Sequence, residues 1–110
     1  MSNLVASFET LRTLAYTGIS TSYAAVGTRF TSQCRIICFT NTTDGDMIFS
    51  TDGINDMIIV PADSFKLFDL TTNRQFDDRI FCLPIGTQIM VKYSAIPTLG
   101  SVYVEVIGGS

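Results

Sequence analysis

The segment of residues 35–60, RIICFTNTTDGDMIFSTDGINDMIIV, decides the fold class. It predicts three short apolar strands, at residues 36–40, 47–50 and 57–60, separated by polar loops at residues 41–46 and 51–56. These loops are rich in Asn, Asp, Gly and Thr, which form turns through their own side chains or tolerate turn backbone conformations. We therefore expect short strands joined by polar turns.

The same rhythm continues to the C-terminus. Pro61 cannot donate a ladder hydrogen bond, so the third strand ends before it, and further strands are expected at residues 65–70 and 79–83. Residues 87–93 and 101–107 show the clearest two-residue period, and we expect them to pair as a hairpin across residues 94–100. Seven or eight such strands predict an all-β, antiparallel β-sandwich of jelly-roll-like form.

Residues 1–28 differ in texture from residues 29–110, which we assign to the sandwich domain. Four apolar residues recur at helical spacing: Leu4, Phe8, Leu11 and Ala15. The section 10–16 also alternates as a strand does, and its Thr and Tyr residues favour strands. The sequence leaves three alternatives for residues 1–28: a short helix, an arm that reaches over a neighbouring subunit, and the first strand of the sandwich.

The composition indicates a protein that packs against other proteins. Apolar residues make up 46% of the 110 residues, but charged residues only 15%, below the roughly 25% that is usual. The net charge is −3 and the seven basic residues are scattered, which disfavours direct binding of nucleic acid. No apolar run is long enough to span a membrane, and the N-terminus does not read as a signal peptide, so we expect an intracellular origin.

The side chains that usually carry catalysis are scarce. The sequence has no histidine, which removes the common general base and most zinc sites. Three cysteines, Cys34, Cys38 and Cys82, read as small hydrophobic residues of the core. The glycines form no loop that would cradle a phosphate. We therefore expect no enzyme activity, no cofactor and no resident metal.

The acidic loops allow two interpretations. Asp44, Asp46, Asp52, Asn55 and Asp56 would supply several oxygen ligands to a hard cation if a meander of the three central strands brought both loops together. Their spacing departs from that of the calcium-binding EF-hand loop. Turn formation by Asp and Asn side chains explains every one of these residues, and we favour it.

Three segments carry a resemblance to a known class of protein: ICFTNTTDGDMIFSTDG, MIIVPADSFKLFDLTTNR and LPIGTQIMVKYSAIPTLGSVYVEVIGG. Together they cover residues 34–109 approximately, and the pattern resembles small structural proteins of tailed-phage virions. The resemblance implies a capsid decoration, or cement, protein: a β-sandwich made in the host cytoplasm and added to the outside of the capsid. There it would bind the major capsid protein and itself, as a homo-oligomer that staples the shell. It transfers no binding residue to this chain.

Candidate interface residues therefore come from the sequence alone. They are apolar or aromatic positions in the N-terminal segment and at the tip of the loop 94–100: Leu4, Phe8, Leu11, Tyr16, Ile96 and Leu99. The loop residues have an alternative role, which is to fold back over the sheet edge. Two other functions remain open. One is a head-to-tail joining or tail component, and the other is a carbohydrate-binding module that uses Tyr16, Tyr23, Tyr93 and Tyr103.

Overall fold

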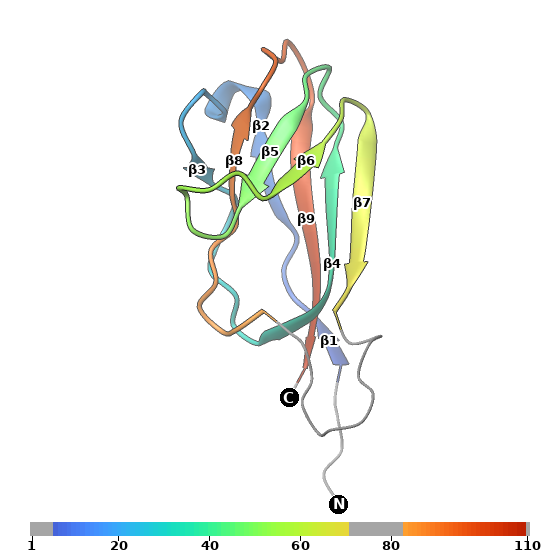
Figure 1. Cartoon of the computed structure of the whole chain (residues 1–110). Helices are drawn as coiled ribbons and strands as arrows, with labels where there is room; N and C mark the ends of the chain where they lie inside the picture. Colours follow the sequence, from blue (N-terminus) through green and yellow to red (C-terminus); the bar gives the residue numbers. More distant parts are fainter. Residues whose placement is uncertain (1–5, 71–82, 110) are drawn as a thin grey trace, which may run out of the picture.

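The computed structural model describes residues 6–70 and 83–109, which form two stacked antiparallel sheets (Figure 1). The first, here called the β9 sheet, has the order β1-β9-β4-β7, with β2 also paired to β9, and the second, the β8 sheet, has the order β3-β8-β5-β6. The strands are β1 (Ala6–Phe8), β2 (Arg12–Ala15), β3 (Ala24–Ala25), β4 (Gln33–Asn41), β5 (Met47–Ser50), β6 (Ile58–Val60), β7 (Ser64–Asp69), β8 (Met90–Tyr93) and β9 (Ser101–Gly109). The 3₁₀ turn η1 (Tyr16–Gly18) follows β2, and the described ranges contain no α-helix.

The strand pairing is that of a jelly roll. Strand β2 pairs with β9, β3 with β8, β4 with β7 and β5 with β6, all antiparallel. This is one long hairpin of eight strands that is rolled up so that successive pairs fall alternately in the two sheets. Two further pairings complete the sheets: β4 pairs with β9 in the first sheet, and β5 pairs with β8 in the second. Strand β1 adds a short strand beside the end of β9. The predicted all-β sandwich of jelly-roll-like form is confirmed.

The core lies between the sheets and follows from the two-residue period of the strands. On β9, Val102, Val104 and Val106 are buried, whereas the residues between them face outward. Phe39 of β4 and Phe49 of β5 meet across the sandwich with ring centroids 4.9 Å apart. Aromatic pairs at this separation add to the free energy of burial, so this contact helps to hold the two sheets together.

The hairpin expected between residues 87–93 and 101–107 is wrong. Strand β8 pairs with β3 and β5, whereas β9 pairs with β1, β2 and β4, so the two lie in opposite sheets. The connection between them crosses from one sheet to the other. Pro97 is buried in it, and Gly100 has φ of +87°, with a Cβ at that position falling 2.4 Å from the Thr42 carbonyl oxygen. Only glycine fits there, and it marks a sheet crossing instead of a hairpin turn.

Residues 6–15 of the N-terminal segment form strands β1 and β2 with a short irregular stretch between them, so the helical alternative for these residues is wrong. Strands β1 and β2 follow one another along the same edge of β9, and β3 forms an edge of the β8 sheet. The first-strand interpretation therefore agrees with the pairing of residues 6–15. Whether residues 1–28 also reach a neighbouring subunit stays a prediction.

Three further expectations concern the remaining strands. Val60 ends β6 directly before Pro61, and β5 has the predicted bounds. Strand β8 starts at Met90 and is shorter than the predicted 87–93, because residues 87 and 89 bond instead to the backbone of Phe30 and Val26. Leu83 forms an isolated bridge to Cys34, but the rest of the strand predicted at residues 79–83 lies outside the described residues, as does Cys82.

Candidate interaction surfaces

The outer surface of the β9 sheet carries a group of apolar side chains that no other described element covers. Cross-strand register places Phe8, Ile107 and Ile36 in one row, and Leu67 and Cys38 in the next. Phe65 follows on β7, one row further. The exposed fractions are 84% for Phe8, 65% for Phe65 and 60% for Leu67. We call these six residues the apolar face: Phe8, Ile36, Cys38, Phe65, Leu67 and Ile107.

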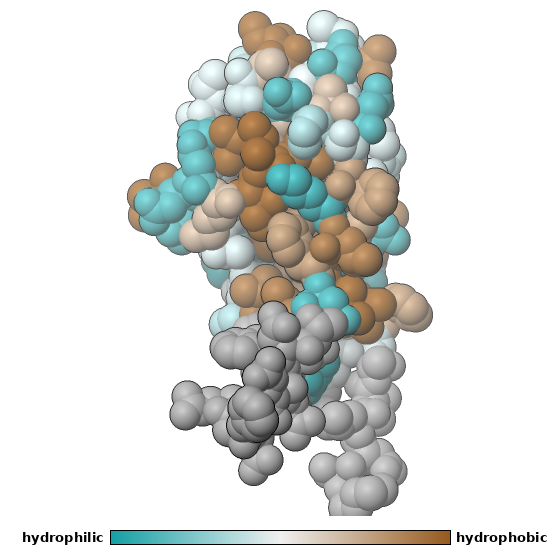
Figure 2. Space-filling view, turned by 45° about the vertical axis from the view of Figure 1, so that its right-hand side comes forward, coloured by the Kyte–Doolittle hydropathy of each residue, from teal (hydrophilic) through white to brown (hydrophobic). Residues whose placement is uncertain are grey.

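The apolar face is hollowed and holds the carboxylate of Glu105, and a second exposed carboxylate, that of Asp69, lies opposite Ile36 at its β7 edge. A depression of about 170 Å³ is lined by Phe8, Ile36, Cys38, Leu67, Glu105 and Ile107. Glu105 is exposed and lies directly opposite Cys38, between Tyr103 and Ile107 on the same side of β9. Figure 2, turned so that the edge with β7 comes forward, shows brown apolar patches broken by a few teal residues on this side of the molecule, and it does not show the outer surface of the β9 sheet face on. Such contiguous exposed apolar surface marks interaction sites in soluble proteins.

The edge next to this face is protected against strand addition. Within the described part of the chain, β7 is the last strand of the β9 sheet, and no described strand pairs with its outer side. Lys66 on this strand lies opposite the buried Phe39, on the core side, and yet is exposed. An inward-pointing charge on an edge strand is a common device against edge-to-edge pairing. Contacts through the side chains of the face are therefore favoured over contacts through the backbone edge.

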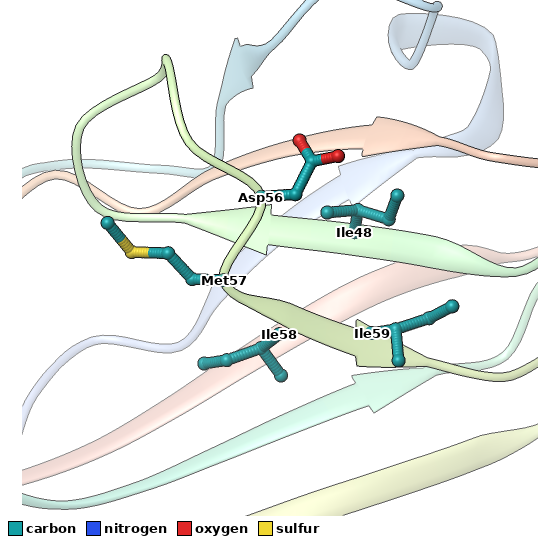
Figure 3. A pocket seen from close by; sticks show the side chains of 5 residues that line it. All are labelled: Ile48, Asp56, Met57, Ile58 and Ile59. Carbon is teal, nitrogen blue, oxygen red and sulfur yellow. The ribbon is translucent and has the colours of Figure 1, made fainter.

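A second hollow lies on the β8 sheet, lined by Ile48, Asp56, Met57, Ile58 and Ile59, with a volume of about 230 Å³ (Figure 3). At its rim, Asp56 accepts a hydrogen bond of 2.5 Å from the Tyr23 hydroxyl, and it lies 2.9 Å from Lys92 Nζ. The Lys92 ammonium group also lies 4.9 Å from the centre of the Tyr23 ring. The three polar side chains thus bind one another at the edge of an apolar hollow.

These contacts make the rim a poor site for proton transfer. Burial and the hydrogen bond to Asp56 raise the pKa of Tyr23 to about 12, so the phenol stays protonated near neutral pH. The hydrogen bonds from Tyr23 and Lys92 lower the pKa of Asp56, so this carboxylate stays ionised. A general acid or base works best with a pKa near the operating pH, and neither group meets that condition.

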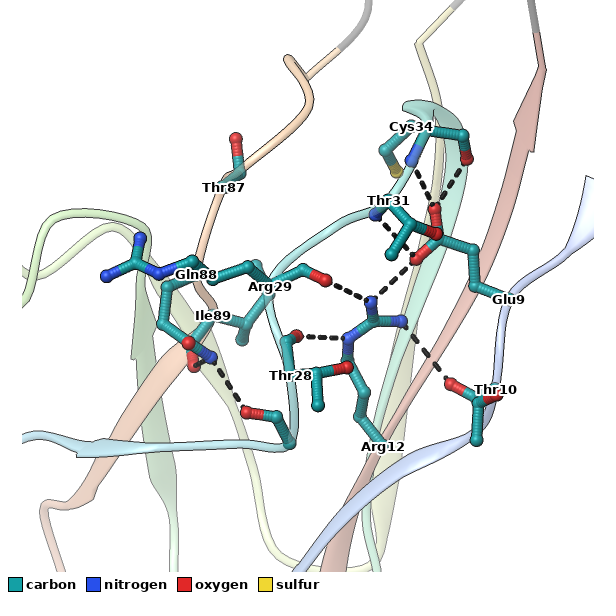
Figure 4. A network of polar contacts seen from close by, with 12 residues as sticks. Glu9, Thr10, Arg12, Thr28, Arg29, Thr31, Cys34, Thr87, Gln88 and Ile89 are labelled. Carbon is teal, nitrogen blue, oxygen red and sulfur yellow. Dashed lines mark hydrogen bonds and ion pairs between the residues drawn. The ribbon is translucent and has the colours of Figure 1, made fainter.

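A second polar cluster is buried and holds the N-terminal strands (Figure 4). Arg12 is 3% exposed, and its guanidinium donates to the carbonyl oxygens of Thr28 at 2.7 Å and Arg29 at 3.1 Å. It also donates to Glu9 Oε1 at 2.6 Å and lies 5.0 Å from the centre of the Phe30 ring. The cluster joins the segment between β1 and β2 to residues 28–32, which is a structural role.

Glu9 completes this cluster from the other side. Its carboxylate accepts hydrogen bonds from the hydroxyl and the backbone N–H of Ser32 and lies in reach of the Thr31 N–H. Burial disfavours the charged form, but the hydrogen bonds from Ser32 and Arg12 outweigh it, and the pKa of Glu9 is lowered. A carboxylate that is held ionised and fully bonded supports the fold and has no free lone pair for chemistry.

The structure separates the interface residues that the sequence predicted. Phe8 lies on the apolar face, opposite Ile107 near the end of β9. Ile96 and Leu99 are 73% and 55% exposed in the loop that precedes the start of β9, about 20 Å away along a strand that rises roughly 3.3 Å per residue. Leu11 is exposed between β1 and β2, and Tyr16 is half-buried in η1. Leu4 lies outside the described residues.

The sequence analysis missed the strongest members of the apolar face, Phe65, Leu67, Ile36 and Ile107. A signal was present, because residues 36–39 form an unbroken apolar run, and β7 carries apolar residues on both of its faces. A strand that is apolar on both faces is usually one that is buried on both faces. The prediction that Cys38 belongs to the core is wrong for the same reason, since Cys38 lies on the outer face, whereas Cys34 is buried as predicted.

The acidic loops lie apart. Residues 41–46 precede β5 and residues 51–57 follow it, so the two loops are at opposite ends of this strand (Figure 1). Asp52 accepts hydrogen bonds from the backbone N–H groups of Asn55 and Ile54, which lower its pKa, and this confirms the turn-forming interpretation for Asp52. Asp44 accepts from Thr98 of the β8–β9 connection. No three Cys, Asp or Glu side chains of the described residues are grouped as metal ligands.

Comparisons with known protein families, with curated proteins and with solved structures found no match to this chain. Among the described residues, no helix is long and apolar enough to cross a membrane.

Proposed function

We propose that this protein is a structural protein of a tailed-phage virion, which binds the outside of the capsid and staples major capsid protein subunits together. The observation that carries the proposal is the apolar face, a broad exposed surface on the outer side of β1, β9, β4 and β7 that no other described element covers. An exposed apolar surface of this kind favours a function that depends on contact with another protein. The resemblance of residues 34–109 to small virion proteins supplies the class of partner.

The composition supports a protein that functions as part of an assembly. Few charged groups need to be desolvated when a surface with only 15% charged residues is covered. A decoration protein repeats its contacts over a lattice, and self-association would link copies so that modest individual contacts become effective together. We accordingly propose that the protein acts as a homo-oligomer on the virion exterior after synthesis in the host cytoplasm.

The polar clusters favour a function without turnover. The Arg12–Glu9 cluster is engaged in holding the fold, and the pKa values of Tyr23 and Asp56 are shifted away from neutrality. These observations support the absence of an enzyme activity. They concern the described residues alone, and an assay of purified protein for hydrolase activity remains the direct check.

The carbohydrate-binding alternative has less support. Tyr23 is covered by Lys92 at the β8 sheet, Tyr93 packs against the core, and Tyr103 lies on the β9 sheet opposite Thr40. Sugar-binding sites of this kind use aromatic rings as a common platform, and these three rings do not form one. A head-to-tail or tail component would use the same kind of contact surface, and imaging distinguishes it.

The test is electron microscopy of particles assembled with and without the protein. We expect particles that carry the protein to show extra density distributed over the capsid faces. Particles assembled without the protein should have shells that are less resistant to heat. Density at a single vertex would replace the proposal with the head-to-tail alternative. Particles of identical density and stability would overturn both.

A further inference from the structure

We infer that the apolar face is the surface that seats on the shell, and that the shell presents a lysine or arginine to Glu105 there. This inference rests on the proposed function and deepens it, because it names the contact surface and the chemistry of the opposing one. It also replaces most of the interface residues predicted from the sequence, and of those it retains Phe8.

The argument starts from the position of Glu105. The register on β9 and β4 sets its side chain beside Cys38, and apolar residues flank it along the strand and across the sheet. The ion pairs between described residues are Glu9 with Arg12 and Asp56 with Lys92, so Glu105 has no cationic partner among them. Covering this face without a cation would bury an uncompensated carboxylate, which strongly disfavours binding. The occupant must therefore bring the positive charge.

This requirement argues against a second copy as the occupant. A symmetric dimer pairs the same patch of both subunits, so the apolar face of one copy would meet the apolar face of the other. The centre of that interface would hold two Glu105 carboxylates. Like charges brought together in a covered interface are repelled by several kcal/mol in general. A surface of opposite charge has no such penalty, and charge complementarity selects it.

The shape of the face indicates what surrounds the cation. The depression beside Glu105 has a volume of about 170 Å³, several times the roughly 30 Å³ that a water molecule occupies in the liquid. It is lined by apolar side chains, so it fits an apolar side chain of the partner. Lys66 disfavours strand addition at the neighbouring edge, as described above, so the contact runs through side chains. The expected partner surface is an apolar knob next to a basic residue.

The experiment measures binding of the purified full-length chain to shells assembled from the major capsid protein of the same virus. Two variants change the face, Leu67→Asp and Glu105→Lys, and one matched control, Ile54→Asp, makes the same apolar-to-acid change at an 80% exposed position in the β5–β6 loop. Thermal unfolding verifies that each variant is folded. We expect each face variant to bind at least about tenfold more weakly, because about 1.4 kcal/mol per variant is a modest loss for a central contact. The control should bind as the unchanged chain does.

A footprint on the unchanged chain tests the same inference without any substitution. Cys38 is half-buried within the apolar face, and alkylation of its thiol by iodoacetamide is followed by mass spectrometry. We expect a slower reaction when the protein is bound to shells. An equal rate in the free and bound protein would contradict the inference.

The outcomes separate the inference from the proposed function. If the unchanged chain does not bind shells, the proposed function fails and the inference with it. If the unchanged chain binds shells and both face variants bind them as tightly as it does, the proposed function stands and the inference is overturned. If Ile54→Asp weakens binding as much as Leu67→Asp does, added charge alone explains the loss and the inference is also overturned. A dimer that Leu67→Asp dissociates, with shell binding unchanged, would assign the face to a second copy instead.

Discussion

Arg12→Ala is the substitution that tests the structural reasoning most sharply. The guanidinium of Arg12 is 3% exposed and donates to the Thr28 and Arg29 carbonyls as well as to Glu9, whose side chain is only 6% exposed. Removal of the arginine leaves the Glu9 carboxylate buried without its cation. It also removes the donor to three backbone carbonyls, those of Thr10, Thr28 and Arg29, and it opens a cavity beside Phe30.

The expected loss follows from general magnitudes for such sites. Breaking a buried ion pair by removing one partner destabilises a protein by about 3–5 kcal/mol. A domain of this size has a total stability of about 5–15 kcal/mol, so the variant should fold only marginally. At roughly 4 °C per kcal/mol for a chain of about 100 residues, the melting temperature should fall by about 12–20 °C.

The assay is urea unfolding followed by circular dichroism, applied to a double-mutant cycle of Arg12→Ala and Glu9→Gln. Glu9→Gln in the Arg12→Ala background should restore part of the lost free energy of unfolding, because it removes the uncompensated charge. We expect a coupling free energy of about 1–3 kcal/mol between the two positions, the range found for residues in one network. Arg29→Ala is the matched control. Arg29 is exposed and donates one hydrogen bond to the Gly86 carbonyl, so its loss should change stability by about 0.5 kcal/mol or less.

Two results would refute the reasoning. One is a loss below about 1 kcal/mol for Arg12→Ala, which would mean that water or a rearranged side chain satisfies the site. The other is simple additivity in the cycle, which would mean that Arg12 and Glu9 act independently. A loss for Arg29→Ala equal to that for Arg12→Ala would indicate a general effect of removing arginine.

Three further predictions concern other polar groups. The lowered pKa of Glu9 contributes stability that is present above its ordinary pKa and is lost as the pH falls through the folded value, so unfolding free energies measured below about pH 4.5 should fall less steeply in Glu9→Gln than in the unchanged chain. Tyr23 should titrate near pH 12, and Asp56→Asn should lower that value, both followed by the ultraviolet absorbance of tyrosinate. Asn41→Ala should destabilise by about 2–4 kcal/mol in urea unfolding, because the buried Asn41 amide donates to the Gly45, Val60 and Pro61 carbonyls.

The strands were predictable because their signal is local. Alternation of apolar and polar residues over four to nine positions marks β9 and β5 without knowledge of the rest of the chain. The pairing of the strands could not be predicted in this way. The alternation indicates that a strand has a buried face, but it does not indicate which sheet contains the strand. The buried valines of β9 would have suited the predicted hairpin with β8 equally well. The sheet crossing at Gly100 is the local feature that distinguishes the two topologies, and its meaning depends on Thr42, which lies 58 residues earlier in the chain.

The position of the exposed apolar side chains was not predictable from the sequence. Low charge and the absence of histidine indicated a contact function, and the search for exposed apolar residues then turned to chain ends and loop tips, where exposure is expected. The apolar face lies instead on regular strands. Its residues read locally as core, and only the pairing of β4, β7 and β9 shows that they share a side that no other described element covers.

The buried charged pair and the apolar face are linked through the short strand β1. The Glu9 backbone N–H donates to the Val106 carbonyl at 3.0 Å, and its side chain is fixed by Ser32 and Arg12. A strand of three residues has too few ladder bonds to set its own register firmly. The anchor that follows it sets the register, and with that register Phe8 lies opposite Ile107. The buried Glu9–Arg12 pair therefore helps to position Phe8, whose side chain is 84% exposed.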